Sequence, residues 1–237
     1  MPSRPTIALY SGIIVDGDGI SSSLRAKLAA LRMAKSSEFD ADVVAFCQYS
    51  DVEDPAIRVV PSVADLLTTP AFGQASLHIF EFGIYYQLFN VALLLRPDQM
   101  AAVYHNITPR QLVVSPLMQT AIDRAMDQKH LLARMSHVAC DSEFNRRDLL
   151  DFGLPADTLS VLPLPICIDG YPPTPRGRRP SSDPIRFLFV GRLVRAKGVL
   201  DLLAATRSLV DSGTTGFEVC LIGRMDGADT VVMEAIV

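Results

Sequence analysis

The sequence predicts an α/β fold in which helices cover both faces of a parallel sheet. Short apolar runs rich in β-branched residues alternate along the chain with longer stretches of helical period. The runs are apolar at nearly every position, as expected for strands that are buried on both faces of a sheet. With 49% hydrophobic and 20% charged residues, the 237-residue chain has enough apolar surface for a sizeable core.

Six of these runs predict the strands of one complete sheet: residues 6–10, 41–46, 76–80, 100–104, 137–140 and 159–162. Four helices are predicted between them: residues 20–35, 84–95, 116–134 and 142–152. The first carries a leucine stripe on one side, and Ser21 and Ser22 are available to cap its start. Ser142 is expected to cap the fourth helix and Gly153 to end it.

The composition changes sharply between residues 163 and 184, which contain seven prolines and three arginines. Such a stretch is typical of a linker between domains. A second α/β pattern follows, with strands expected at 186–190 and 218–222 and a helix at 198–210. One such unit cannot bury both faces of its sheet. We therefore expect a first domain over residues 1–167, a linker over 168–184 and a partial second domain over 185–237.

Composition also excludes several classes of function. A net charge of −4, without a Lys/Arg block interleaved with aromatic residues, argues against a nucleic-acid partner. Cys47, Cys140, Cys167 and Cys220 are scattered, so neither a metal site nor a disulfide framework is predicted. No apolar stretch approaches the ~20 residues of a spanning helix, and the N-terminus does not read as a secretory signal. We expect a cytoplasmic protein.

The clearest chemical signal is FLFVGRL at residues 187–193, followed by Lys197 and Gly198 at the start of a helix. The strand delivers Gly191 to its carboxyl end, where open α/β sheets bind ligands. Arg192 offers a planar fork for phosphate oxygens, and Lys197 adds a charge beside the unpaired N–H groups of a helix N-terminus. Together these groups fit a diphosphate. The alternative is that both cations are solvated and merely flank a turn.

Extended to its KGVLDLLAA continuation, this segment resembles the opening of the donor-binding domain of retaining glycosyltransferases of family 4, which have the GT-B fold. VYHNITP at 103–109 and VACDSEFNRRDL at 138–149 resemble that family's N-terminal domain, in the right order. The resemblance covers almost the whole chain. It implies a Rossmann-like acceptor-side domain followed by the first part of a Rossmann-like donor-side domain.

The resemblance implies transfer of a sugar, with retention, from a UDP- or GDP-sugar to a hydroxyl of a glycan or lipid-linked acceptor, with no obligatory cofactor or metal. Arg192 and Lys197 would contact the donor diphosphate, and His105 would face the transferred sugar. The family's Glu-x7-Glu segment has no counterpart before Val237, so the chain is expected to be truncated and, alone, a poor transferase. A lipid-linked acceptor would bring peripheral contact with the inner face of the membrane.

The loop before the first helix contains Gly17, Asp18 and Gly19, whose small residues let backbone amides approach a ligand. It resembles the family's first loop, which makes Gly19 a candidate for the diphosphate and Gly17 and Asp18 candidates for the acceptor. A flexible turn that caps the helix is the alternative. Read up to Ser22, the same loop resembles a dinucleotide fingerprint without its third glycine, so an NAD-dependent oxidoreductase is a weaker alternative.

Glu81, Asn106 and Ser142 are further acceptor-side candidates because each follows or ends a predicted strand. The alternative roles are structural: Glu81 would cap or solvate the next helix, Ser142 would only cap, and His105 would order its loop by bonding the backbone. At the level of the whole chain, the main alternative to an enzyme is a non-catalytic or partner-dependent binding module with the same fold.

Overall fold

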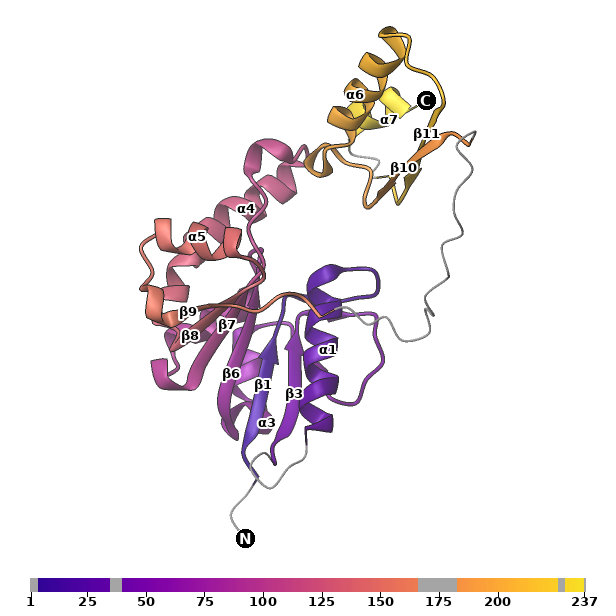
Figure 1. Cartoon of the computed structure of the whole chain (residues 1–237). Helices are drawn as coiled ribbons and strands as arrows, with labels where there is room; N and C mark the ends of the chain where they lie inside the picture. Colours follow the sequence, from indigo (N-terminus) through magenta and orange to yellow (C-terminus); the bar gives the residue numbers. More distant parts are fainter. Residues whose placement is uncertain (1–3, 35–39, 166–182, 226–228, 237) are drawn as a thin grey trace. The chain divides into compact units, whose positions relative to one another are not determined.

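The computed structural model describes residues 4–34, 40–165, 183–225 and 229–236 (Figure 1). The chain forms two compact units, Met1–Ile107 with Thr120–Ile166, and Thr108–Gln119 with Cys167–Val237. Nearly all of the linker expected at 168–184 lies outside the described residues. Within the described part of the chain, no helix is both long and apolar enough to cross a bilayer.

The first unit is built on a seven-stranded parallel sheet in the order β5-β3-β1-β6-β7-β8-β9. Its strands are β1 (Thr6–Tyr10), β3 (Asp42–Cys47), β5 (Ile57–Val59), β6 (Ala75–Phe82), β7 (Met100–Tyr104), β8 (His137–Cys140) and β9 (Leu159–Val161). All six predicted strands are confirmed. The sequence missed β5 and the short pair β2 (Ile13–Ile14) and β4 (Tyr49–Ser50), because two or three residues show no periodicity.

Helices cover both faces of this sheet (Figure 1). The α-helices from the first strand to residue 165 are α1 (Gly19–Met33), α2 (Val63–Leu67), α3 (Pro70–Gly73), α4 (Pro116–Gln128) and α5 (Glu143–Asp151). Short 3-10 helices join them: η1 (Gln87–Leu93), η2 (Pro97–Gln99), η3 (Arg110–Leu112), η4 (Lys129–Arg134) and η5 (Ala156–Thr158). The helix predicted at 116–134 is therefore α4 followed by η4.

The α-helix predicted at 84–95 is wrong, because this stretch forms the 3-10 helix η1. The Tyr86 carbonyl accepts from the backbone N–H of Phe89 at 3.3 Å, as in a 3-10 helix, and the amide of Gln128 adds tertiary hydrogen bonds to this stretch. Its Nε2 donates to the carbonyl of Tyr86 at 3.0 Å and to Asn90 Oδ1 at 2.7 Å, and its Oε1 accepts from the backbone N–H of Tyr86. In an α-helix, the Tyr86 carbonyl would instead accept from the backbone of Asn90. Tertiary contacts here override local propensity.

The two faces of the sheet carry different cores. Leu24 and Leu28 of α1 pack against Ile7, Leu9 and Ala45 on one face, as the leucine stripe predicts. The alternate residues of the same strands point to the other face and form an aromatic cluster, in which the ring of Tyr10 lies 4.6 Å from that of Phe80 and 5.5 Å from that of Phe46.

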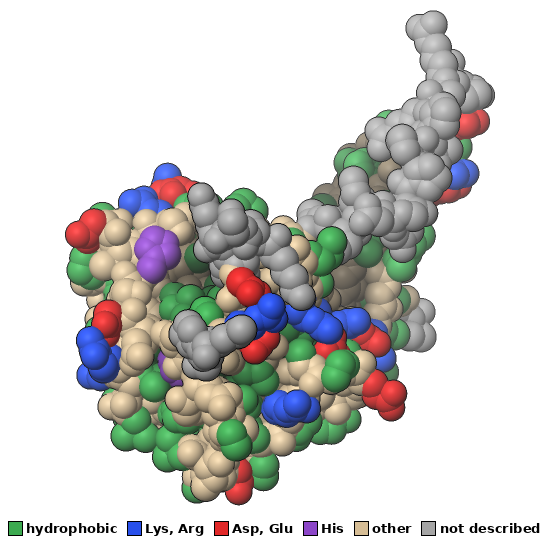
Figure 2. Space-filling model, turned by 90° about the horizontal axis from the view of Figure 1, so that it is seen from below, with side chains coloured by type: hydrophobic (Ala, Val, Ile, Leu, Met, Phe, Trp, Pro, Cys, Tyr) green, Lys and Arg blue, Asp and Glu red, His purple; other side chains and the backbone are tan. Residues whose placement is uncertain are grey.

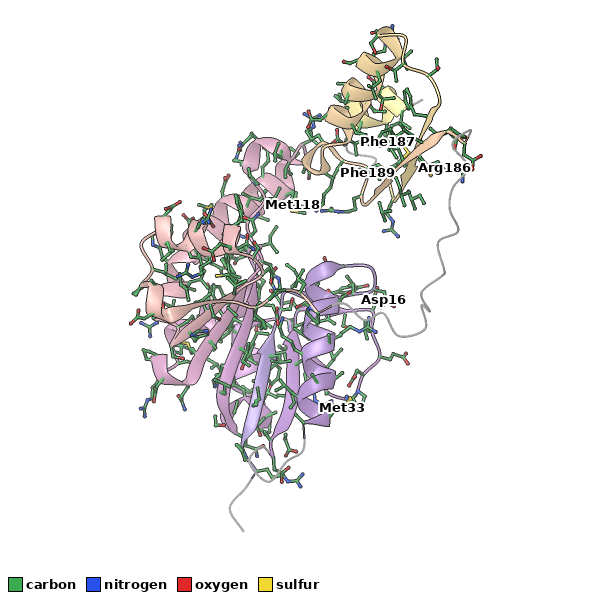
Figure 3. All side chains as sticks on the ribbon, viewed as in Figure 1. Asp16, Met33, Met118, Arg186, Phe187 and Phe189 are labelled. Carbon is green, nitrogen blue, oxygen red and sulfur yellow. The ribbon has the colours of Figure 1, made fainter. Side chains whose placement is uncertain are left out.

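The second unit contains the parallel pair β10 (Ile185–Val190) and β11 (Phe217–Ile222), with η6 (Arg195–Lys197), α6 (Val199–Asp211) and α7 (Thr230–Ile236). The predicted strands and helix are confirmed to within one residue. β10 and β11 form a sheet of their own. Phe189, labelled on β10 in Figure 3, and Leu221 pack with buried Val199 and Val232 on the helix-covered face.

Candidate functional site

Three polar side chains meet at the carboxyl ends of β6, β7 and β8. Glu81 is the second-last residue of β6, while His105 and Asp141 directly follow β7 and β8. The strand register pairs Glu81 with Val103 and Val103 with Ala139. Since side chains alternate along a strand, His105 and Asp141 emerge on the face that carries Glu81, which is the face covered by α1.

These residues form a buried chain of ion pairs with Lys27 of α1. Lys27 Nζ lies 3.0 Å from Glu81 Oε1, Glu81 Oε2 lies 2.5 Å from His105 Nε2, and His105 Nδ1 lies 2.8 Å from Asp141 Oδ2. The side chains of Glu81 and His105 are 0% and 3% exposed. We call these four residues the His105 network.

Both ring nitrogens of His105 therefore face a carboxylate oxygen. A neutral imidazole has one N–H and satisfies one such acceptor, whereas an imidazolium satisfies both. Burial alone lowers the pKa of His105, but the hydrogen bonds and charges of Asp141 and Glu81 outweigh burial and raise it to about 9. The network thus holds a positive ring between two negative groups.

The unfolding free energy of the first unit is expected to fall as the pH rises from about 6.5 to about 9. In this window folded His105 keeps a proton that the unfolded chain, with an ordinary histidine pKa, has already released. The loss is on the order of 3 kcal/mol. Urea unfolding at a series of pH values, followed by near-ultraviolet circular dichroism of the tyrosines, measures it. His105→Gln should remove this alkaline dependence, and a flat profile in the natural chain would contradict the assignment.

The loop after His105 packs tightly against neighbouring backbone. Asn106 has a φ of +68°, a left-handed conformation that few residues other than glycine adopt readily. A Cβ placed on Gly83 would lie 3.0 Å from His105 Cβ, 3.1 Å from Ile20 Cδ1 and 3.2 Å from the carbonyl oxygen of Asn106. Gly83 thus marks the place where the first turn of α1 and the His105 loop come together.

The loop before α1 is closed by one of its own carboxylates. Asp18 is the N-cap of α1, and its Oδ2 accepts from the backbone N–H and the hydroxyl of Ser21, both at 2.8 Å. The expectation that Ser21 or Ser22 caps this helix is therefore wrong. Gly17 has a φ of +77°, which a glycine adopts without strain. A negative group already on the helix N-terminus disfavours a phosphate beside Gly19, and so disfavours a dinucleotide there.

Ser142 caps α5, as expected, by accepting from the backbone N–H of Asn145 at 3.2 Å. A contact between Ser142 or Asn106 and an acceptor remains a prediction. The alternative that Glu81 caps or solvates the next helix is wrong, because its side chain is buried in the His105 network. Sequence reasoning missed Asp141 and Lys27. Their signals were present: Asp141 follows its strand as His105 does, and Lys27 borders the leucine stripe of α1.

The predicted diphosphate-binding turn follows β10 in the second unit. Gly191 donates its backbone N–H to the carbonyl of Ile222 at 2.9 Å, which ties the end of β10 to β11. Arg192 and Lys197 are exposed, and neither side chain pairs with another described residue. Gly198, with a φ of +75°, begins α6 without a side-chain cap. The N-terminus of α6 thus differs from that of α1 in having no side-chain cap among the described residues, although Asp201 places a carboxylate in its first turn.

A buried carboxylate fixes this turn. Asp229 Oδ2 accepts from the backbone N–H of Arg195 at 2.9 Å, and its Oδ1 lies 3.2 Å from the guanidinium of the same residue. Burial alone raises the pKa of Asp229, but the bonds from Arg195 outweigh it and hold the pKa below its usual value. Asp229 therefore anchors the stretch between Arg192 and Lys197 from the side of α7.

A cavity of about 460 Å³ lies at the other end of the first unit, where β1 and β3 begin. Arg4, Arg32 and Arg58 line it, and two of these arginines are paired with aspartates at 3.0 and 3.1 Å. On the face shown in Figure 2, basic and acidic side chains lie beside one another instead of gathering by sign. The cavity contains none of the residues singled out from the sequence.

No protein-family model matches the sequence, and no curated protein matches it. Among solved structures, the chain is similar to the lipopolysaccharide outer core galactosyltransferase WaaB in its apo form, with 16% identity and a TM-score of 0.57 over 97% of this chain and 64% of that one. It is also similar to "Trehalose-6-phosphate from E. coli bound with UDP-2-fluoro glucose", with 13% identity and a TM-score of 0.56 over 98% of this chain and 68% of that one.

A third similar structure is a putative UDP-N-acetylglucosamine 2-epimerase from Listeria monocytogenes, with 13% identity and a TM-score of 0.53 over 99% of this chain and 66% of that one. The chain spans about two thirds of the length of these proteins. Two Rossmann-like α/β units in series, the first with a full parallel sheet, define the class of fold. It is the GT-B fold, of which the chain has a part.

Proposed function

We propose that this protein is a retaining glycosyltransferase, similar to family 4, that moves a sugar from a UDP- or GDP-sugar to an acceptor hydroxyl. The observation that carries the proposal is the turn after β10. Two exposed cations, Arg192 and Lys197, precede α6 and pair with no other described residue, and the N-terminus of α6 has no side-chain cap among those residues. Such a combination suits a diphosphate. The GT-B fold is separate support for the proposal, because the structural similarity covers 97% of this chain and does not depend on the turn after β10.

The chemical role of this turn is to stabilise charge. As the bond between the sugar and the diphosphate breaks, negative charge grows on the leaving phosphate oxygens. Arg192, Lys197 and the dipole of α6 would stabilise the transition state more than the ground state, which is the condition for faster reaction. Asp229 contributes by holding the turn in place before the ligand arrives. Gly191 would let the phosphates approach the backbone closely.

The first unit is proposed to serve the acceptor side, with His105 at its centre and Gly17, Asp18, Glu81, Asn106 and Ser142 around the same sheet edge. The acceptor is proposed to be a glycan or a lipid-linked glycan, in the cytoplasm or at the inner face of the membrane. The buried ring of His105 has both nitrogens engaged. Any contribution of His105 to sugar transfer is therefore proposed to depend on the position and protonation that Glu81 and Asp141 impose on its ring.

Binding of UDP and GDP to the 237-residue chain, measured by isothermal titration calorimetry, tests the proposal. Arg192→Ala and Lys197→Ala are each expected to weaken binding by about 10-fold or more, because a hydrogen bond to a charged group contributes about 1.5–3 kcal/mol. Arg207→Ala is the matched control, since Arg207 is an exposed cation on α6 that is already paired with Asp211. Its affinity should match that of the natural chain.

Equal affinities in all three variants would refute the diphosphate site. Failure of the natural chain to bind either nucleotide would instead favour a non-catalytic module whose diphosphate site has decayed.

A further inference from the structure

The His105 network leaves the histidine no free ring nitrogen. Glu81 Oε2 lies 2.5 Å from Nε2, and Asp141 Oδ2 lies 2.8 Å from Nδ1. The side chain of His105 is 3% exposed. The groups that face the ring come from two different strands, Glu81 from β6 and Asp141 from the end of β8, while Lys27 of α1 lies behind Glu81 at 3.0 Å. The two ring nitrogens are therefore contacted by carboxylates from two separate strands.

The residue after His105 has a left-handed backbone conformation. Asn106 has a φ of +68°, which asparagine adopts more readily than most non-glycine residues but which still costs free energy relative to the right-handed or extended regions. The backbone N–H of His105 donates to the carbonyl of Phe82 at 2.8 Å, and Gly83 leaves only enough room for the loop to pass. The backbone is thus held on one side by β6, and the side chain of His105 is held by the network.

We propose that Glu81 and Asp141 are positioning residues, which together fix His105 and the left-handed Asn106 at the carboxyl end of β7. Lys27 supports them by compensating the charge of Glu81 inside the core. The assignment of this sheet edge to the acceptor side rests on the proposed function. The positioning of His105 by Glu81 and Asp141 rests on their contacts with the two ring nitrogens. Glu81, whose side chain has no exposed surface, would then serve the acceptor side through His105.

Nuclear magnetic resonance of the full chain tests this proposal. The ring signals of His105, identified by their loss in His105→Gln, are followed against pH in the natural chain and in Glu81→Gln and Asp141→Asn. Each variant is expected to lower the titration midpoint of His105 by about 1 unit or more, because an opposite charge near a titrating group shifts it by about that amount. Each should also shift and broaden the amide signal of Asn106.

Asp148→Asn is the matched control. Asp148 pairs with buried Lys129 at 2.8 Å and with the hydroxyl of Tyr104, the residue before His105, but does not touch the His105 ring. This variant removes an ion pair of the same kind and should leave the midpoint of His105 unchanged. Asp141 lies at the edge of the network and is 13% exposed, so Asp141→Asn should still fold if Glu81→Gln does not. An unmoved midpoint or an unchanged Asn106 signal in Asp141→Asn would overturn the proposal.

The outcome is separable from that of the proposed function. The proposed nucleotide-binding turn belongs to the second unit, so UDP affinity and the titration of His105 are separate readouts. A natural chain that binds neither UDP nor GDP would defeat the glycosyltransferase assignment and leave the titration result standing. UDP binding that depends on Arg192, together with an unmoved His105 midpoint in Asp141→Asn, would defeat the positioning role alone.

Discussion

Glu81→Ala is expected to lower the unfolding free energy of the first unit by about 3–5 kcal/mol, the cost of leaving buried charges without their partner. Glu81 has no exposed side-chain surface, and its carboxylate is shared by Lys27 and His105. Its removal strands one cation that is largely buried and another that is almost completely so. It also takes away one of the two carboxylates that keep the ring of His105 protonated.

Amide hydrogen exchange of β6 and β7 measures this loss, because it reports on the first unit separately from the second. Asp98→Ala is the control: Asp98 also pairs with an arginine, at 2.8 Å, but both side chains are largely exposed. A surface pair of this kind contributes little, so the control should change stability by no more than about 0.5 kcal/mol. Comparable effects in the two variants would show that the His105 network does not stabilise the core.

The second large effect is expected from Gly223→Ala, which should disrupt the pairing of β10 and β11. A Cβ at this position would lie 1.7 Å from the carbonyl oxygen of Gly191 and 2.7 Å from its carbonyl carbon. Both are backbone atoms, so no side chain can rotate away to relieve the overlap. Overpacking of this severity is expected to cost about 3 kcal/mol or more. Because Gly191 precedes Arg192, the proposed diphosphate-binding turn should be displaced as well.

The readout is amide protection in β10 and β11, together with UDP affinity. Gly213→Ala is the control in the same unit, since Gly213 has a φ of +78° but open space around its Cα. Its substitution should cost about 1–2 kcal/mol from backbone strain alone and leave the turn intact. If β10 is protected equally in the two variants, the close approach of Gly223 to Gly191 is not what holds the strand ends together.

The exposed apolar face of β10 and β11 shows how far the second unit is from a fully covered sheet. Leu188, Val190 and Ile222 are 64%, 69% and 52% exposed, and together they leave one face of the strand pair unpacked by the described residues. Parallel strands are normally buried on both faces. The second unit is therefore expected to be the less stable of the two, and the control substitution at Gly213 should already affect it measurably.

The sequence by itself determined the order of the longer strands and of the helices α1, α4, α5 and α6, but not the short elements β2, β4, β5, α2 and α3. Buried parallel strands require continuous apolar runs, and α1 and α6 each carry an apolar stripe. Both patterns can be recognised from residues that are close together in the sequence. The candidate positions at strand ends followed from the same reasoning, because the carboxyl ends of parallel strands share one edge of a sheet. Glu81 was singled out for this reason, and His105 through the family resemblance; the structure places Glu81 Oε2 2.5 Å from His105 Nε2.

Only the tertiary structure decided which polar groups pair. Lys27 lies 54 residues from Glu81, and Asp141 lies 36 from His105, so no local pattern records their contacts. Likewise, residues 84–95 have a helical period, yet Gln87–Leu93 form a 3-10 helix, and the carbonyl of Tyr86 at its N-cap accepts from Gln128 of another helix. Ion pairs and side-chain hydrogen bonds to the backbone depend on distances across the fold, so they could not be predicted. Periodicity depends on neighbours along the chain, so the strands and helices that it marks could be.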